Sequence, residues 1–247
     1  MRRWLATSRW PRFLGSSLAL AVFGATLLFT VGHRYRVKRS YAVAERNWDE
    51  GNYRKAVELY QAVLDEYPSD PLAHEAHFRI GNTYYLFLQQ EREAILAFRD
   101  LTKKDPSGPW GQKAQKKLGE IFEKRLEDYR QAIVEYQRLM NLSSSPEESE
   151  NAQLAVARCY FKLGDFAQAR EEYEIFLERY PESPRRDRAL DGLASTFYVT
   201  RRYQSAITYY RMVIDESEDR ERRAEAGFGI ASCLEEAGSH QAALEQF

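Results

Sequence analysis

The sequence predicts an all-α protein, a solenoid of stacked helical hairpins preceded by a single apolar helix. Two observations predict it. Small residues recur at a fixed interval through most of the chain, and a 20-residue segment near the N-terminus carries no charge. The 247 residues, 44% hydrophobic and 13% aromatic, can fill a substantial core. We therefore expect a folded protein.

Charge is distributed unevenly along the chain. Residues 1–40 contain eight Lys or Arg and no acid, while the remainder contains 28 basic and 37 acidic residues. An acidic body repels the phosphate backbone of nucleic acids at long range. We therefore expect no nucleic-acid partner, and the basic residues instead flank the apolar segment.

The apolar segment covers residues 13–32 and reads FLGSSLALAVFGATLLFTVG. A helix of this length, rising about 1.5 Å per residue, spans roughly 30 Å, the thickness of a bilayer's hydrocarbon core. It predicts a single transmembrane anchor after a basic segment, residues 1–12. A cleaved signal peptide is the alternative, although the run is long for one and lacks a small-x-small cleavage site. Four basic residues on each side leave the sidedness open.

Three series of small residues repeat in phase through the rest of the chain. They stand at intervals of 37 or 38 residues, with one interval of 36 at the end of the second series. The first series is Ala44, Gly81, Gly119, Ala157, Ala194 and Ala231; the second is Ala56, Ala94, Ala132, Ala169, Ala206 and Ala242; the third is Ala76, Ala114, Ala152, Ala189 and Ala226. Repetition with this period predicts stacked supersecondary units.

Each unit is expected to form a helical hairpin, as residues 150–181 illustrate. Ala152 and Ala157 lie on one face of the first helix, which Gly164 and Asp165 should end with a turn. The second helix should begin near Phe166 and stop before the proline at 181. Small residues let the two helices approach, and aromatic side chains fill the space beside them.

One motif identifies the family. A small residue, an aromatic three residues later, the run G-x-[YF]-x-x-A-x-x-x-[YF] and a closing proline occur at Ala157, Tyr160, Gly164, Phe166, Ala169, Tyr173 and Pro181. This pattern resembles the tetratricopeptide repeat. The resemblance implies a right-handed solenoid over residues 38–247, with repeats at about 38–68, 72–106, 110–141, 147–181, 185–217 and 221–247, the last incomplete. The sequence departs from the family in its longer period and in Glu91 and His240, which replace aromatics.

Two joints between repeats indicate which members of the family the sequence resembles most. Residues 66–76 and 178–189 both contain a Tyr-Pro pair followed by Ser and a later Ala. They are similar to the joints of bacterial envelope repeat proteins, including outer-membrane assembly lipoproteins and Tol-Pal-associated proteins. The resemblance implies a cell-envelope scaffold, in the inner membrane with the repeats in the periplasm. No Cys lies near the apolar segment, so the lipid attachment of those lipoproteins is not expected.

The family resemblance also implies a partner-binding groove lined by the first helix of each hairpin. It would receive an extended or helical segment of another protein, with aromatic side chains supplying contact area and charges setting register. The candidate residues are Glu75, Phe78, Asn82, Tyr85, Lys113, Lys116, Glu120, Lys124, Asn151, Leu154, Arg158, Phe161, Lys162, Arg188, Asp191, Ser195 and Tyr198. Glu120 stands where a chaperone-binding clamp needs Asn, so chaperone binding is not expected.

Residues capable of catalysis or metal binding form no recognisable constellation. His74 and His77 lie three apart without a nearby third ligand. Cys159 and Cys233 share a register two repeats apart, too distant to bond, and are expected to be small core residues. The sequence contains no phosphate-binding glycine loop and no nucleophile elbow. We predict no enzyme activity, no cofactor and no metal.

Three hypotheses about function stay open. The first is a membrane-anchored scaffold that recruits envelope proteins. The second is a soluble exported protein, released by cleavage of the apolar segment. The third is an accessory domain of a longer protein, because the sequence stops at Phe247, inside the expected second helix of the sixth hairpin.

Overall fold

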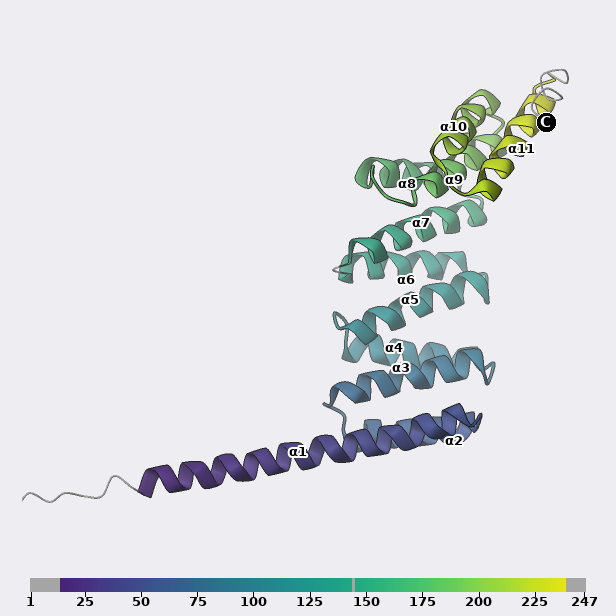
Figure 1. Cartoon of the computed structure of the whole chain (residues 1–247). Helices are drawn as coiled ribbons and strands as arrows, with labels where there is room; N and C mark the ends of the chain where they lie inside the picture. The colour runs from purple at the N-terminus through teal and green to yellow at the C-terminus, as the bar shows by residue number, and fades with distance from the viewer. Residues whose placement is uncertain (1–13, 144, 239–247) are drawn as a thin grey trace, which may run out of the picture. The chain divides into compact units, whose positions relative to one another are not determined.

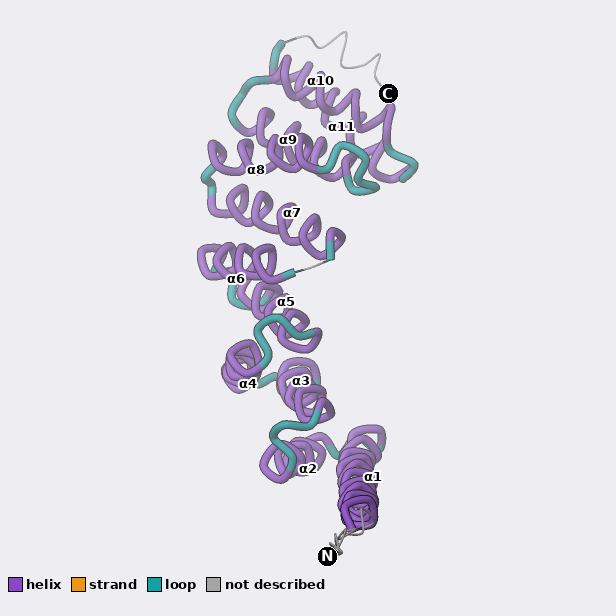
Figure 2. The backbone as a smooth tube through the Cα atoms, turned by 90° about the vertical axis from the view of Figure 1, so that its left-hand side faces the viewer, coloured by secondary structure: helices purple, strands orange, loops and turns teal. Residues whose placement is uncertain are grey.

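The computed structural model describes residues 14–143 and 145–238, with side chains described from Gly32 onward. The described chain contains eleven α-helices and no strand, which confirms the all-α prediction (Figures 1 and 2). It divides into two compact units, unit 1 up to Thr83 and unit 2 from Tyr84. Each unit is a succession of helices joined by short loops.

Unit 1 contains α1 (Leu14–Asp49), α2 (Tyr53–Glu66) and α3 (Pro71–Leu86) as far as Thr83. Helices α1 and α2 pack as a hairpin, with Ala44 and Ala56 fully buried. The sequence predicts an apolar helix up to residue 32 and a first repeat from residue 38. In the structure both belong to α1, one helix of 36 residues (Figure 1). Residues 33–41 contain neither Gly nor Pro, so nothing interrupts the helix there.

The predicted membrane anchor lies almost wholly outside the residues whose side chains are described. Within the described residues, no helix combines the length and the apolar character needed to cross a bilayer. Of the predicted span at residues 13–32, only Gly32 has a described solvent exposure, while residues 14–31 are described as helical backbone. The basic segment at residues 1–12 and the second helix of the sixth hairpin, from residue 239, also lie outside.

Unit 2 is a succession of hairpins in which each helix packs against the next, from α4 to α11. These helices are α4 (Glu91–Lys104), α5 (Pro109–Lys124), α6 (Tyr129–Leu142), α7 (Pro146–Leu163), α8 (Phe166–Arg179), α9 (Arg186–Val199), α10 (Tyr203–Glu216) and α11 (Arg220–Glu236). The first helices of successive hairpins also contact each other directly, α7 with α9 and α9 with α11. The odd-numbered helices therefore share one face of the unit.

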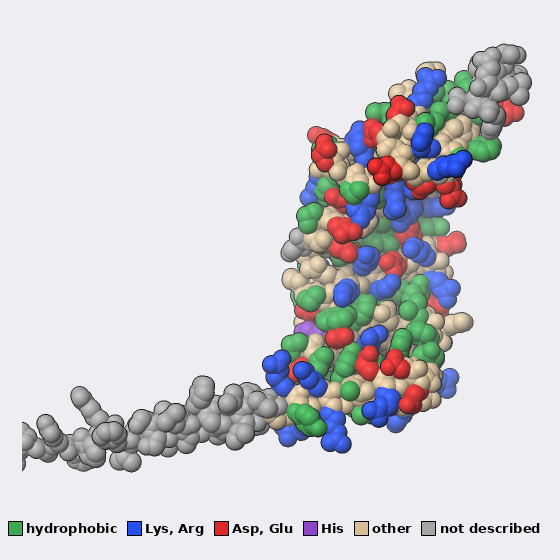
Figure 3. All heavy atoms as spheres, in the orientation of Figure 1, with side chains coloured by type: hydrophobic (Ala, Val, Ile, Leu, Met, Phe, Trp, Pro, Cys, Tyr) green, Lys and Arg blue, Asp and Glu red, His purple; other side chains and the backbone are tan. Residues whose placement is uncertain are grey.

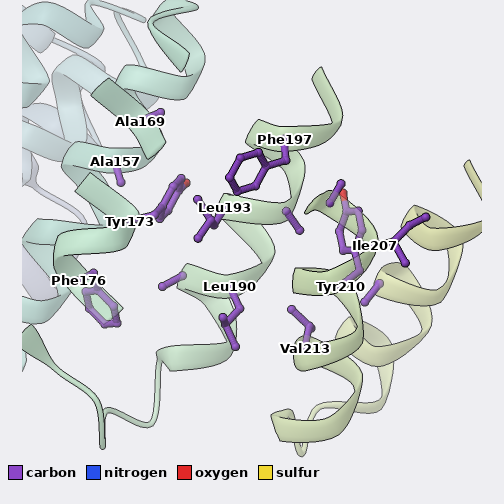
Figure 4. Close-up of a cluster of buried hydrophobic side chains, with 14 of the residues drawn as sticks. Ala157, Ala169, Tyr173, Phe176, Leu190, Leu193, Phe197, Ile207, Tyr210 and Val213 are labelled. Atoms are coloured by element: carbon purple, nitrogen blue, oxygen red, sulfur yellow. The ribbon is translucent and has the colours of Figure 1, made fainter. Parts of the chain in front are cut away.

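The repeated small residues lie between helices, as the sequence predicted. In unit 2 the alanines at 94, 132, 169 and 206 are all 0% exposed. A continuous core runs through α7 to α11, where Tyr173 of α8 points toward Leu193 of α9 and where Phe176 and Leu190 belong to the same cluster (Figure 4). The burial of these positions follows from the need for close helix approach, which only small side chains permit.

The turn inside each hairpin has one backbone geometry throughout. Gly164 ends α7 in the left-handed conformation (φ 82°), and the Asp165 side chain accepts a hydrogen bond from the Gln168 backbone N–H at 3.2 Å. The predicted end at Gly164 and Asp165 is confirmed. The same left-handed position is occupied by Gly51, Gln89, Glu127 and Arg201 in the other described hairpins.

The joints between hairpins carry a polar clamp that sequence reasoning did not anticipate. The Ser183 hydroxyl donates to Glu150 at 2.6 Å and accepts from the Arg185 backbone N–H at 3.1 Å. The Arg185 guanidinium also pairs with Glu150, at 3.2 Å. Because Glu150 belongs to the preceding hairpin, this serine–acid–arginine clamp ties α7 to the start of α9.

A second clamp with the same composition occurs one repeat later. The Ser217 hydroxyl donates to Asp187 at 2.7 Å, and Arg222 Nε lies 3.0 Å from the same carboxylate. Asp187 and Arg222 follow Glu150 and Arg185 by 37 residues each. The clamp is therefore a repeated feature of this part of the solenoid.

Candidate functional site

A groove opens between α7, α9 and α11 on the face formed by the first helices of unit 2. It has a volume of about 240 Å³ and is called here the α7–α9–α11 groove. Its lining residues are Asn151, Leu154, Arg158, Tyr173, Arg188, Asp191, Gly192 and Arg222. Charged side chains of both signs are interspersed over unit 2 on the face shown in Figure 3.

The floor of the groove is a tyrosine that packs under a glycine. A Cβ atom on Gly192 would lie 2.2 Å from Cζ of Tyr173, so only glycine fits at this position without displacing the ring. Tyr173 comes from α8 and is 6% exposed. Burial raises the pKa of its phenol to about 12, so the hydroxyl stays protonated at neutral pH and can donate a hydrogen bond.

One charge on the rim is held by an internal ion pair. Arg158 reaches Glu123 of α5 with two hydrogen bonds, Nε to Oε1 at 2.6 Å and a terminal nitrogen to Oε2 at 3.0 Å. The Tyr136 hydroxyl donates to the same carboxylate at 2.8 Å. Burial opposes ionisation of Glu123, but the bonds from Arg158 and Tyr136 outweigh it and lower its pKa. Arg158 therefore has a structural partner.

Arg222 is likewise engaged, because it belongs to the second joint clamp with Asp187. Two other charged residues in the groove, Arg188 and Asp191, differ from Arg158 and Arg222 in this respect. Within the described part of the chain, neither Arg188 nor Asp191 forms an ion pair. Burial raises the pKa of Asp191, opposed in part by the charge of Arg222. The groove thus offers one exposed cation and one partly buried carboxylate, neither of which is held in an ion pair within the described residues.

The groove gathers five of the predicted site residues, namely Asn151, Leu154, Arg158, Arg188 and Asp191. It adds Tyr173, Gly192 and Arg222, which the prediction missed. Arg222 lies on the first helix of the sixth repeat, and the prediction stopped at the fifth. Extending the predicted positions by one repeat of 37 residues gives Glu225 and Phe228, so the register alone would not have pointed to Arg222, which lies three residues before Glu225 on the same helix. Tyr173 was predicted as a core residue, and it is indeed largely buried. Its ring reaches the groove because the residue packed on it, Gly192, has no side chain.

Most of the other predicted residues of unit 2 contact near neighbours. Lys116 pairs with Glu148 at 3.2 Å, and Glu120 pairs with Lys117 at 2.7 Å. The ammonium group of Lys113 lies 4.1 Å from the centre of the Trp110 ring, and the Arg125 guanidinium lies over the Tyr85 ring. Phe161 packs edge-on to Phe166, and Tyr198 packs at a tilt against Tyr203. The Ser195 hydroxyl lies 3.3 Å from the Tyr210 hydroxyl. Lys124 and Lys162 are exposed at the ends of α5 and α7.

Three predicted residues belong to unit 1. Phe78 is 9% exposed and counts among the buried residues of α3, while Glu75 and Asn82 are partly exposed on the same helix. In unit 2, Leu154 is also largely buried at 7% and packs in the core beneath the groove. Register alone could not separate these buried positions from exposed ones, because the groove face of a helix passes gradually into its packed face.

The two cysteines are free and buried, as the sequence predicted. Burial raises the pKa of the Cys159 thiol to about 12 and that of Cys233 to about 11. Thiols of this kind are weak nucleophiles at neutral pH. Among the described residues, no group of three His, Cys, Asp or Glu side chains is arranged to hold a metal ion.

The succession of packed hairpins defines the class of protein, an α-helical repeat protein with a groove on its first-helix face. The sequence profile of the tetratricopeptide repeat family matches residues 41–109 and 154–221. The chain belongs to the tetratricopeptide repeat family. No curated protein sequence matches it.

Solved structures share the fold at low sequence identity. A tetratricopeptide repeat protein from Parabacteroides merdae has a TM-score of 0.62 and 17% identity, covering 85% of this chain and 77% of its own. PilF from Pseudomonas aeruginosa has a TM-score of 0.57 and 15% identity, covering 87% and 90%. PilW, a type IV pilus biogenesis factor, has a TM-score of 0.53 and 19% identity, covering 85% and 90%.

Proposed function

We propose that this protein is a scaffold that binds a segment of another protein in the α7–α9–α11 groove. The observation that carries the proposal is the pair Arg188 and Asp191, which line the groove without an intramolecular ion pair. One repeat earlier, the equivalent positions hold Asn151 and the buried Leu154. A carboxylate whose ionisation is opposed by burial weakens the fold, and such groups are typical of binding sites.

The groove favours a partner with complementary polar groups. Arg188 can form a bidentate pair with an acidic side chain, while Asp191 and the Tyr173 hydroxyl can accept from and donate to a peptide backbone. The polar rim sets register, and the tyrosine supplies rigid contact area. An extended segment carrying one acidic side chain therefore fits the groove best. Tetratricopeptide scaffolds are generally non-catalytic, and we assign no reaction to this one.

We further propose that the scaffold is anchored through residues 13–32 in a bacterial inner membrane, with its repeats in the periplasm. Support comes from the uncharged apolar segment and from the Tyr-Pro-x-Ser joint at residues 180–183. PilF and PilW, which share the fold, supply a further reason, since PilW is a pilus biogenesis factor. The role we propose is in cell-envelope assembly or maintenance.

The groove is tested by affinity capture of the whole chain from detergent-solubilised membranes. We expect proteins captured by the wild type to be lost from a variant combining Arg188→Ala and Asp191→Leu. A matched control combines Arg211→Ala and Asp215→Leu, which change the same charges on exposed positions of α10. If the groove variant captures the same proteins as the control, the groove is not the binding surface.

The anchor is tested separately by washing membranes with alkaline carbonate. An embedded helix keeps the chain in the pellet, whereas a soluble exported protein is released. Sequencing of the mature N-terminus decides between these two hypotheses, because a terminus beyond residue 25 means that the apolar segment has been cleaved. A longer gene product with a further domain would revive the accessory-domain hypothesis.

A further inference from the structure

Five exposed positions within residues 34–39 of α1 form a basic belt, defined here as Arg34, Tyr35, Arg36, Lys38 and Arg39. All five side chains are exposed, and Tyr35 is 67% exposed. Within the described residues, none of the four basic side chains forms an ion pair. No acidic residue occurs on α1 before Glu45. The belt is therefore a concentrated positive charge without internal compensation.

The opposite side of the same helix is fixed to the repeat domain. Val37 is fully buried, and His33 lies 3.8 Å from Asp70 and packs edge-on to Tyr67, with ring centres 5.3 Å apart. These contacts place the acidic turn between α2 and α3 against one arc of α1. Successive helical residues are about 100° apart, since a turn contains 3.6 residues, so the belt covers the remaining arc. The basic groups are thus exposed on a helix that is fixed to the repeat domain, with Arg36 at the edge of the belt nearest Tyr67.

We infer that the basic belt binds the headgroups of anionic phospholipids, an inference that rests on the proposed membrane anchor. The belt begins two residues after the apolar segment ends at Gly32, and α1 passes through both without a break. All its residues lie within roughly 10 Å of that end along the helix axis, the depth of a headgroup layer. Guanidinium groups bind phosphate oxygens bidentately, and tyrosine is enriched at membrane interfaces.

Lipid is the occupant that the geometry favours over an acidic protein. The belt surrounds the exposed arc of a helix at the point where an embedded span would leave the hydrocarbon. The nearest phosphates are then those of the surrounding lipids, and an acidic protein would have to displace them. Clusters of four or more basic residues next to a span attract anionic lipid strongly enough to enrich it locally. The belt would also hold the first repeat at the membrane surface.

The test uses the full chain reconstituted in phosphatidylcholine vesicles containing spin-labelled phosphatidylglycerol or spin-labelled phosphatidylcholine. The measured quantity is the ratio of the two lipids' association with the protein, from the motionally restricted fraction of each spectrum. We expect a preference of roughly two- to fivefold for phosphatidylglycerol at low salt, falling toward one in 1 M salt. Replacing all four basic residues of the belt by Gln should abolish the preference.

A matched variant controls for net charge. It carries Arg92→Gln, Lys103→Gln, Arg211→Gln and Arg223→Gln, four exposed positions outside the belt, and should keep the wild-type preference. An equal association of both lipids with the wild type, or a preference that survives in the belt variant, overturns the inference. Failure of the anchor is distinguishable, because the chain would then not float with the vesicles after a carbonate wash and would restrict neither lipid.

Discussion

The hairpins α7–α8 and α9–α10 are built on one plan but differ at their surfaces. Their equivalent interior residues, Ala152 and Ala189, are at most 1% exposed. Their turns share a left-handed residue, but Gly164 fills that position in one and Arg201 in the other. On the groove face, Leu154 of α7 corresponds to Asp191 of α9.

The comparison shows that different physical constraints restrict the choice of residue at interior, turn and groove positions. Interior positions are limited by the distance between helix backbones, so both hairpins use small residues there. The turn position is limited only by backbone strain of about 1 kcal/mol, which an exposed arginine can bear. The groove face contributes little to stability at Asp191, so that position is free to serve recognition. Four predictions test this order, beginning with the largest effect.

The strongest test adds a methyl group where a tyrosine packs on glycine. Gly192→Ala would bring a Cβ to 2.2 Å from the Tyr173 ring, and Gly229→Ala to 2.6 Å from the Tyr210 ring. Each should lower the free energy of unfolding by about 1–3 kcal/mol through overpacking, with the larger loss at Gly192. Urea unfolding followed by circular dichroism measures the change.

The control for this prediction lies on the same helix as Gly229. No atom comes within 4 Å of a Cβ at Gly227, so Gly227→Ala should raise stability by about 0.5–1 kcal/mol through its better helix propensity. If Gly227→Ala and Gly229→Ala change stability alike, tyrosine packing does not limit these positions.

The two joint clamps should contribute equally to stability, although the loops that carry their serines differ in length. Ser183→Ala removes the hydroxyl bond to Glu150, and Ser217→Ala removes the one to Asp187. Both serines are buried, so each substitution should cost about 1 kcal/mol. A double-mutant cycle of Ser183→Ala with Glu150→Ala should show a coupling of about 0.5–1 kcal/mol. Additive effects would mean that the bond contributes nothing to the joint.

Placing glycine in the α9–α10 turn and removing it from the α7–α8 turn should shift stability in opposite directions. Arg201→Gly relieves a left-handed backbone at φ 59° and should raise stability by about 0.5–1 kcal/mol. Gly164→Ala imposes the same strain on the other turn and should lower stability by about 1 kcal/mol. Thermal unfolding of both variants provides the measurement, and shifts of the same sign would contradict the comparison.

The smallest effect concerns Asp191 and depends on pH. Burial raises its folded-state pKa, so the folded protein binds more protons than the unfolded chain above the ordinary Asp value of about 3.9. Stability from this group is therefore fully present below that value and is lost as pH rises through the raised pKa. Asp191→Asn should match the wild type in acid and exceed it at neutral pH. A constant difference between the two unfolding curves from pH 3 to 7 would refute this.

The fold could be predicted because its signal is local and repeated. The positions of Ala169, Gly164 and Phe166 in one repeat define a small interface, a turn and a helix start, and the same pattern recurs in the others. Register along the chain does not determine the exposure of a residue whose neighbours come from another helix. Leu154 and Asp191 share a register and both line the groove, yet the first is largely buried in the core beneath it and the second is partly exposed.

The sequence by itself determined the hairpin repeat, its register and the residues that lie between helices, because spacing along the chain dictates which side of a helix faces inward. Only the tertiary structure decided which surface charges are satisfied. Arg222 finds Asp187 at 3.0 Å, and Arg158 finds Glu123 at 2.6 Å, whereas Arg188 finds no acid among the described residues. These pairings depend on distances between helices some 35 residues apart, which no local pattern records.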